Sequence, residues 1–226
     1  MQSTFWQLDG HIARLTLPRL SLEFDADQPG EGLRNLVVVD RPWPQGRLLG
    51  VAGPIPSAAS GALTDWHVRG DDLIAVYETG QPDAARIDLL WHVARPVAGV
   101  SWLARIDLLV SIRTDRLDWR HDVRLESVIP AATACEELPP AGDRFVGKDW
   151  DWSLALLVHP ADLRKRELSG LPGAQCLCQR LFPMESLEKG VVLRARAAAL
   201  FLHPDAETAA LTGSLFEFTT ADPRLD

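Results

Sequence analysis

Charged side chains at every second position of several segments are the residues in this sequence best suited to bind a polar ligand. Arg86, Asp88 and His92 form one such series, and Arg105 and Asp107 form another. Alternate residues of a strand point to the same face of a sheet, so each series is predicted to project from one surface. Guanidinium forks and carboxylates hydrogen-bond the vicinal hydroxyls of sugars and also bind small anionic ligands. The candidate ligand-binding residues on the predicted polar face are His92, Arg105, Asp107, Asp122, Arg124, Glu126, Arg194 and Arg196.

The same residues have a second interpretation, a solvated outer face that carries cross-strand ion pairs. Exposed pairs of this kind contribute little each, and one face of an antiparallel sheet is commonly polar in any case. The two interpretations differ in shape. A groove lined by these residues favours a ligand, whereas a flat face with paired charges favours solvation.

The segment Asp149-Trp150-Asp151-Trp152 is a further candidate because it alternates two carboxylates with two indoles. In a strand, both carboxylates would lie on one side and both indoles on the other. An indole presents a broad apolar ring that can cover the apolar face of a pyranose. Trp150 and Trp152 are therefore expected either to contact a ligand or to be buried in the core.

β-Strands must position these residues. Between Val100 and Arg113 all seven even positions are apolar and five of the seven odd positions are polar. This two-residue period is typical of a strand whose faces have different surroundings, and it recurs along the chain without a repeat of fixed length. The predicted fold class is all-β, a large and mostly antiparallel twisted two-sheet sandwich with one or two short helices. A sandwich of 226 residues is expected to form a single domain, residues 1–226.

Two stretches are predicted to be loops. Residues 41–62 contain four prolines, which is unfavourable for a central strand because proline lacks a donor for the ladder. Residues 130–146, polar and rich in proline, are predicted to form a second long loop. Near the C-terminus, Pro204 followed by acidic residues predicts the start of a short helix, and residues 215–220 are expected to form a closing strand.

Composition restricts the partners. The net charge of -8 argues against nucleic acid and anionic membranes, which are bound through clustered lysine and arginine. No run of 18 apolar residues is present, and residues 1–10 lack the charged and apolar segments of a secretory signal. We therefore expect a cytoplasmic protein without a membrane span. The oligomeric state is left open.

The cysteines and the absent motifs argue against a metal or a cofactor. Three cysteines are an odd number, which indicates a reducing compartment rather than a disulfide framework. Cys176 and Cys178 point to one face of a predicted strand but lack a second pair of ligands. The chain contains no G-x-S-x-G, H-E-x-x-H, P-loop or G-x-G-x-x-G motif. No metal site and no cofactor are predicted.

Two segments resemble the galactose mutarotase-like β-sandwich proteins. They are residues 20–36, in which Leu20-Ser21-Leu22-Glu23-Phe24 leads through a Gly-rich turn to Leu33-Arg34-Asn35-Leu36, and residues 187–196. The resemblance implies a large twisted sandwich whose concave sheet holds carbohydrate. The family's catalytic glutamate and histidine have no matching motif here, so no catalytic residue is transferred.

Three functions follow as hypotheses. The first is binding of a carbohydrate-like ligand on the polar sheet face, with catalysis unassigned. The second is a sugar epimerase or lyase, in which a carboxylate and a histidine or arginine exchange protons with the substrate. The third is a protein-interaction module without a small ligand, which would expose an apolar patch.

Overall fold

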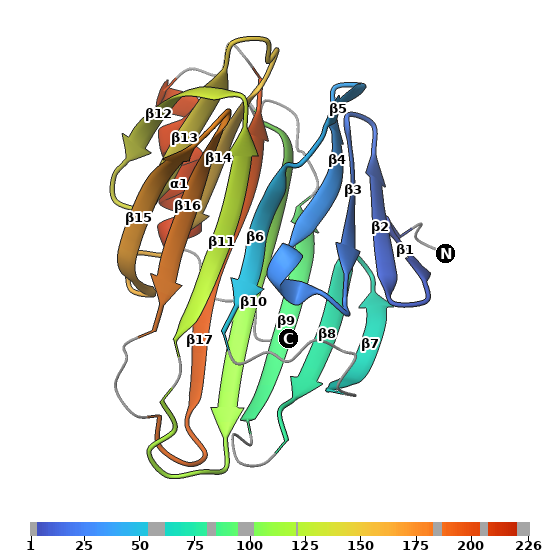
Figure 1. Ribbon diagram of the computed structural model, residues 1–226, viewed down its shortest axis with the longest axis vertical. Coiled ribbons are helices and arrows are strands. Elements are labelled where there is room, and N and C mark those ends of the chain that lie inside the picture. Colours follow the sequence, from blue (N-terminus) through green and yellow to red (C-terminus); the bar gives the residue numbers. More distant parts are fainter. Residues whose placement is uncertain are drawn as a thin grey trace.

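The computed structural model describes residues 4–53, 62–80, 85–94, 102–120, 122–182, 187–203 and 208–220. Within them the chain forms two antiparallel sheets and one α-helix, so the predicted all-β sandwich is confirmed (Figure 1). Within these residues, no helix has both the length and the apolar composition required to cross a membrane.

The first sheet has nine strands in the order β1-β2-β3-β4-β6-β11-β16-β15, and β5 pairs with β4 off this path. Its strands are β1 (Trp6–Asp9), β2 (Ile12–Leu17), β3 (Leu20–Asp25), β4 (Leu33–Val38), β5 (Arg41–Trp43), β6 (Arg47–Ala52), β11 (Val123–Pro130), β15 (Leu163–Leu171) and β16 (Ala174–Leu181). A short 3-10 helix, η1 (Pro29–Glu31), joins β3 to β4, which pair antiparallel. Proline and glycine are typical residues of such a turn.

The second sheet has eight strands in the order β12-β13-β14-β17-β10-β9-β8-β7. Its strands are β7 (Leu63–Arg69), β8 (Asp72–Glu78), β9 (Ala85–Ala94), β10 (Trp102–Thr114), β12 (Ala132–Leu138), β13 (Gly142–Gly147), β14 (Ser153–Val158) and β17 (Val192–Leu202). The alternation that predicted β10 holds strictly, because buried and partly exposed residues alternate from Trp102 to Ile112. β8 pairs antiparallel with β9.

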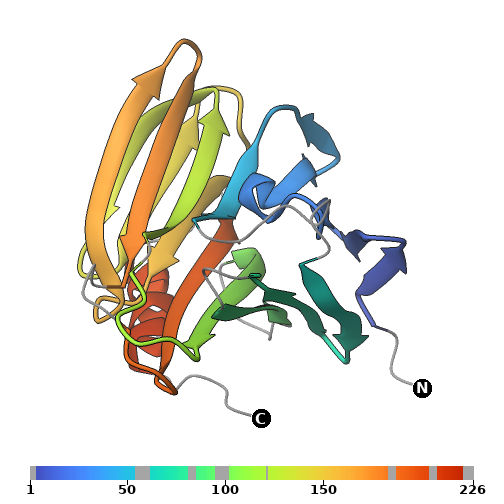
Figure 2. The ribbon, with the colours of Figure 1, turned by 60° about the horizontal axis from the view of Figure 1, so that its bottom comes forward.

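The core lies between the two sheets. Their inward residues, among them Phe24, Leu125, Trp91 and Ile106, form one continuous apolar cluster. The helix α1 (Thr208–Thr220) packs on the opposite side of the eight-stranded sheet, where Leu211, Leu215 and Phe218 cover a second, smaller cluster. Figure 2 shows the two layers and the helix. Each sheet therefore has an inner face and an outer face, and α1 occupies one part of the eight-stranded sheet's outer face.

Three local predictions are wrong. Residues 47–52, expected to lie in a surface loop, form β6, a central strand between β4 and β11. Prolines flank this strand rather than interrupt it, and glycines let it approach η1 closely, since a Cβ at Gly50 would overlap the Gly30 carbonyl oxygen. Residues 130–146, also expected to be a loop, form the hairpin β12–β13. Residues 215–220 belong to the helix α1 because their apolar residues cover the sheet.

Candidate functional site

The outer face of the eight-stranded sheet holds the densest group of candidate residues. Asp72, His92 and Asp107 are direct neighbours across β8, β9 and β10. The His92 Nδ1 atom lies 2.7 Å from Asp72 Oδ1. Because a carboxylate only accepts hydrogen bonds, a neutral His92 donates from Nδ1 and is in the tautomer with an unprotonated Nε2. The structure thus brings an acid and a base together beside a second carboxylate.

Arg105 closes this group on the side of the helix. Its Nε donates to Asp107 Oδ1 at 2.8 Å, and its Nη1 lies 3.6 Å from Glu217 Oε2 of α1. The guanidinium also lies over the Phe218 ring, 5.8 Å from the centroid. The Arg105 side chain is only 11% exposed, so the helix and the sheet together hold it in one orientation.

A strip of aliphatic side chains crosses the same face beside the polar group. Ile74, Leu90 and Leu109 are neighbours in register on β8, β9 and β10, and all three are partly exposed. The next polar row along the strands contains Asp88 and Ser111, which are likewise paired in register. An apolar strip bordered on two sides by hydrogen-bonding groups matches the amphipathic surface of a sugar ring.

The arginines of β17 lie on this face as predicted. Arg194 pairs in register with Ser111, and Arg196 pairs with Leu109. Arg194 is exposed and has no ion-pair partner among the residues that the structure describes. The backbone N–H of Arg196 donates to Asp162 Oδ2 at 3.0 Å. His92, Arg105, Asp107, Arg194 and Arg196 therefore share one face.

The other three charged candidates lie on the opposite side of the molecule. Asp122 immediately precedes β11 and Arg124 and Glu126 belong to it, on the outer face of the nine-stranded sheet. Arg124 lies 3.6 Å from Asp122 and 3.8 Å from Glu126, and Arg180 Nε lies 2.8 Å from Asp122. The expectation that all eight charged candidates share one face is corrected, because β11 joins the sheet opposite to that of β10.

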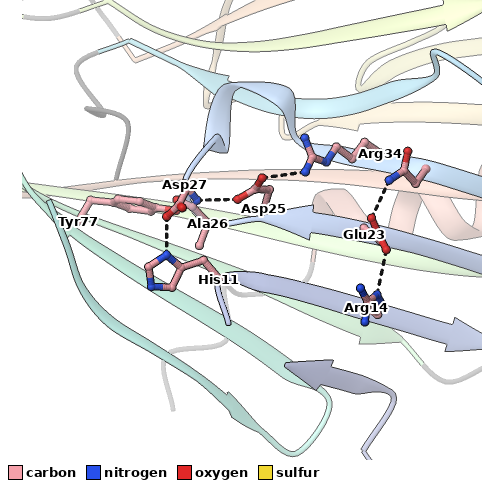
Figure 3. A network of polar contacts seen from close by, with 9 residues as sticks. His11, Arg14, Glu23, Asp25, Ala26, Asp27, Arg34 and Tyr77 are labelled. Atoms are coloured by element: carbon pink, nitrogen blue, oxygen red, sulfur yellow. Dashed lines mark hydrogen bonds and ion pairs between the residues drawn. The ribbon is translucent and has the colours of Figure 1, made fainter. Parts of the chain in front are cut away.

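Paired charges continue along the outer face of the nine-stranded sheet. Figure 3 shows the contacts of Glu23 with Arg14 and of Asp25 with Arg34. Asp25 accepts from Arg34 at 2.7 Å, and Glu23 also accepts from Asn35. The hydrogen bond from Asn35, followed by that from Arg14, lowers the pKa of Glu23. These contacts tie β2, β3 and β4 together and give this part of the face a structural role.

A buried tyrosine reaches this network from the other sheet. The Tyr77 hydroxyl of β8 donates to the Ala26 carbonyl oxygen at 2.8 Å (Figure 3). Burial raises the pKa of Tyr77, and the negative charges of Asp27 and Asp25 raise it further. Tyr77 therefore acts as a neutral hydrogen-bond donor that holds the end of β3 against the eight-stranded sheet.

The tryptophan candidates form an aromatic cluster between the sheets. Trp150 and Trp152 stack with ring centroids 4.3 Å apart, and Trp43 of β5 packs edge-on against both. Trp152 is 3% exposed, so its ring has no free face for a ligand. The expected alternation is corrected, because the two indoles pack on each other instead of projecting from a strand. The cluster connects β5 to the segment that precedes β14.

Sequence reasoning missed two partners of the predicted residues. Asp72 was not among the candidates, although it pairs in register with His92. Glu217 comes from a segment predicted as a strand. The antiparallel pairing of β8 and β9 is the signal that could have identified Asp72. Among the described residues, no group of three or more histidine, cysteine or acidic side chains is placed to hold a metal ion.

Comparisons with known proteins place the fold but not the family. No family model and no curated protein sequence matches the chain. A solved structure from Klebsiella pneumoniae, provisionally assigned as an aldose 1-epimerase, matches 96% of this chain and 87% of that chain with a TM-score of 0.50 and 10% identity. A provisionally assigned kojibiose phosphorylase from the human microbiome matches 90% of this chain and 22% of that chain, with 11% identity and a TM-score of 0.42. The first match confirms the galactose mutarotase-like sandwich fold that residues 20–36 and 187–196 indicated.

Proposed function

We propose that this protein binds a carbohydrate on the outer face of its eight-stranded sheet. The polar group comprises Asp72, His92, Arg105 and Asp107, and the aliphatic strip beside it comprises Ile74, Leu90 and Leu109. The observation that carries the proposal is the adjacency of these two surfaces. Carboxylates and a guanidinium hydrogen-bond sugar hydroxyls, and aliphatic side chains cover the C–H surface of the ring.

The structural neighbour supports the ligand class. The protein with the similar structure is provisionally assigned as an aldose 1-epimerase, an enzyme that acts on a sugar. Its structural likeness to this chain extends over most of both chains. Fold likeness by itself leaves function undetermined. The proposal therefore depends on the side chains of the outer face, and the likeness indicates which ligands to test first.

The test compares two aspartates in similar settings on opposite faces. Asp107 is 28% exposed and pairs with Arg105 at 2.8 Å, whereas Asp122 is 30% exposed and pairs with Arg180 at 2.8 Å. Monosaccharides and disaccharides are added to wild-type protein, Asp107→Asn and Asp122→Asn, and the melting temperature and the heat of binding are measured. A ligand selective for the folded state raises the melting temperature. We expect a shift in the wild type and in Asp122→Asn, and its loss in Asp107→Asn.

Two outcomes would contradict the binding proposal. One is that no sugar shifts the wild-type melting temperature or releases heat on titration. The other is that both aspartate variants bind as the wild type does, which would place the ligand elsewhere. Circular dichroism of each variant confirms that the fold is intact before binding is measured.

The contact between His92 and Asp72 supports a second candidate function, proton transfer to or from a bound sugar. A histidine whose Nδ1 is held by a carboxylate can use Nε2 as a general base. Interconversion of sugar anomers or epimers is followed by NMR with the wild type, His92→Gln and Asp72→Asn. We expect both variants to lose at least about tenfold in rate. An interconversion rate that equals the buffer rate in the wild type excludes this second function and leaves the binding proposal intact.

A further inference from the structure

A small cavity opens on the outer face of the eight-stranded sheet, away from the helix. Its volume is about 150 Å³, and the residues around it come from the end of β8, the start of β9 and the end of β10. They are Glu78, Thr79, Ala85, Arg86, Arg113 and Asp115. Glu78, Arg86 and Arg113 are neighbours in register. Arg86 and Arg113 are each six residues from His92 and Asp107 on the same strands, so their side chains point to the same face of the sheet. The cavity is therefore part of the face to which we assign carbohydrate binding.

Two arginines lie side by side in this cavity. Arg86 and Arg113 occupy directly opposite positions of β9 and β10, and like charges in such positions destabilise a sheet. Asp88 accepts from Arg86 Nε at 2.8 Å and compensates one of the two charges. The exposed Arg113 side chain has no hydrogen-bonded or ionic partner among the described residues. An anionic group bound at Arg113 would satisfy this guanidinium and offset the repulsion.

Two carboxylates border the same cavity. Glu78 pairs in register with Arg86, and Asp115 lies two residues beyond Arg113. Neither carboxylate forms an ion pair within the described parts of the chain. A simple inorganic anion would be repelled by them. A ligand that also carries hydroxyl donors would be accepted, because hydroxyls donate to carboxylates.

The hydroxyl side chain among the described residues of the cavity is already engaged. Thr79 Oγ1 accepts from the Ala85 backbone N–H at 2.9 Å. The charged groups thus dominate what the cavity can recognise: one guanidinium that needs an acceptor and two carboxylates that need donors. A planar carboxylate matches the two parallel N–H groups of an arginine.

We propose that this cavity binds the acidic end of a sugar acid, in which one carboxylate and several hydroxyls belong to the same ring. The carboxylate pairs with Arg113, and the hydroxyls donate to Glu78 and Asp115. The row of Asp88 and Ser111 lies between the cavity and the aliphatic strip, so a longer acidic saccharide continues along the face. This inference rests on the proposed carbohydrate binding and specifies the charge of the ligand.

The experiment measures the affinity of the wild type for glucuronate, glucose and inorganic phosphate by calorimetry at low ionic strength. The test variant is Arg113→Gln. The control is Arg164→Gln, which removes one exposed arginine from β15 of the other sheet and changes the net charge equally. We expect glucuronate to bind the wild type and Arg164→Gln at least about tenfold more tightly than glucose, as a charge-assisted hydrogen bond implies. Arg113→Gln should bind both sugars alike.

The remaining outcomes distinguish the sugar acid proposal from the proposal that the face binds carbohydrate. If glucose binds as tightly as glucuronate to the wild type, the sugar acid proposal is wrong and carbohydrate binding stands. If neither sugar binds, both proposals are wrong. If inorganic phosphate binds as tightly as glucuronate does, the cavity is a general anion site. The proposed hydroxyl contacts to Glu78 and Asp115 are then disproved. Weakening of the glucuronate preference by added salt would support the ionic contact.

Discussion

The two outer faces of the sandwich are both charged, yet they use their charges differently. On the nine-stranded sheet, Asp122 contacts two arginines and Glu23 contacts an arginine and an asparagine, so opposite charges neutralise each other within the face. On the eight-stranded sheet, Arg113 and Arg194 have no ionic partner in the described chain, and an aliphatic strip separates the polar rows. The first arrangement pairs its charges within the face, and the second leaves two guanidinium groups without an ionic partner among the described residues.

This difference shows that strand alternation cannot distinguish two charged faces whose side chains are paired differently. Arg105-x-Asp107 of β10 and Asp122-x-Arg124 of the β11 region have the same spacing and similar composition. What separates them is the set of neighbours in register: a histidine with its carboxylate on one side, and a second arginine on the other. The predictions below test this comparison, beginning with the largest expected effect.

The largest effect is expected at an ion pair on the inner side of the nine-stranded sheet, which contrasts with the pairs on its outer side. Arg166 Nε donates to Asp143 Oδ2 at 2.7 Å, and the Asp143 side chain is 0% exposed. The same hydrogen bonding raises the pKa of Arg166. Arg166→Met leaves a buried carboxylate without its partner, so the free energy of unfolding should fall by about 3 kcal/mol. Urea denaturation measures this change.

The matched substitution on the outer side is Arg180→Met. Arg180 and Asp122 are each 30% exposed, and an ion pair at such exposure contributes at most about 1 kcal/mol. We expect Arg180→Met to lower the free energy of unfolding by less than a third of the Arg166→Met effect. Equal losses would mean that the outer pairs are structural anchors and would remove the contrast between the two sides.

The next effect concerns the aliphatic strip beside the polar group of the eight-stranded face. Leu109→Asn replaces an apolar contact surface and should weaken sugar binding about fivefold, the equivalent of about 1 kcal/mol. Val128→Asn makes a similar change at a partly exposed position of β11 and should leave the affinity unchanged. Titration calorimetry of both variants gives the comparison. An unchanged affinity in Leu109→Asn would show that the strip does not contact the ligand.

The smallest effect is a pH dependence on the nine-stranded face. Hydrogen bonds from Asn35 and Arg14 lower the pKa of Glu23 in the folded state. A carboxylate with a lowered folded pKa adds stability above its unfolded pKa of about 4.3, and this stability is lost as the pH falls through the folded pKa. Glu23→Gln should therefore reduce the acid-induced loss of stability between about pH 6 and about pH 3. Urea denaturation at several pH values measures the free energy of unfolding of both proteins. An identical pH profile in the wild type and the variant would contradict the stabilisation by ionised Glu23.

Most strands could be predicted from the sequence because burial alternates with a period of two. β10 and β9 alternate strictly between buried and partly exposed residues. The central strand β6 was missed because its burial is nearly continuous, with Leu48 to Val51 all buried, and because prolines lie close to it. The helix α1 was misassigned in part because its apolar residues cover the outer face of the eight-stranded sheet, a contact that a local pattern does not record.

The candidate site could be predicted only in part. Arg105, His92 and Asp107 were identified from alternation, and the structure places them together. Asp72 and Glu217 were not identified, because their proximity depends on strand pairing and on helix docking. The alternation of Asp149 to Trp152 was misleading, because these residues lie in a turn before β14 and the two indoles stack on each other.

The sequence by itself determined which side chains point inward and which point outward, because inside and outside follow from a local two-residue period. Only the tertiary structure decided which outward side chains share a surface. β10 and β11 are consecutive in the chain, yet β10 pairs with β9 and β17 while β11 pairs with β6 and β16. The connection between them crosses from one sheet to the other, so Asp107 and Asp122 face opposite directions. Strand partners are chosen by packing over the whole core, which no local pattern records.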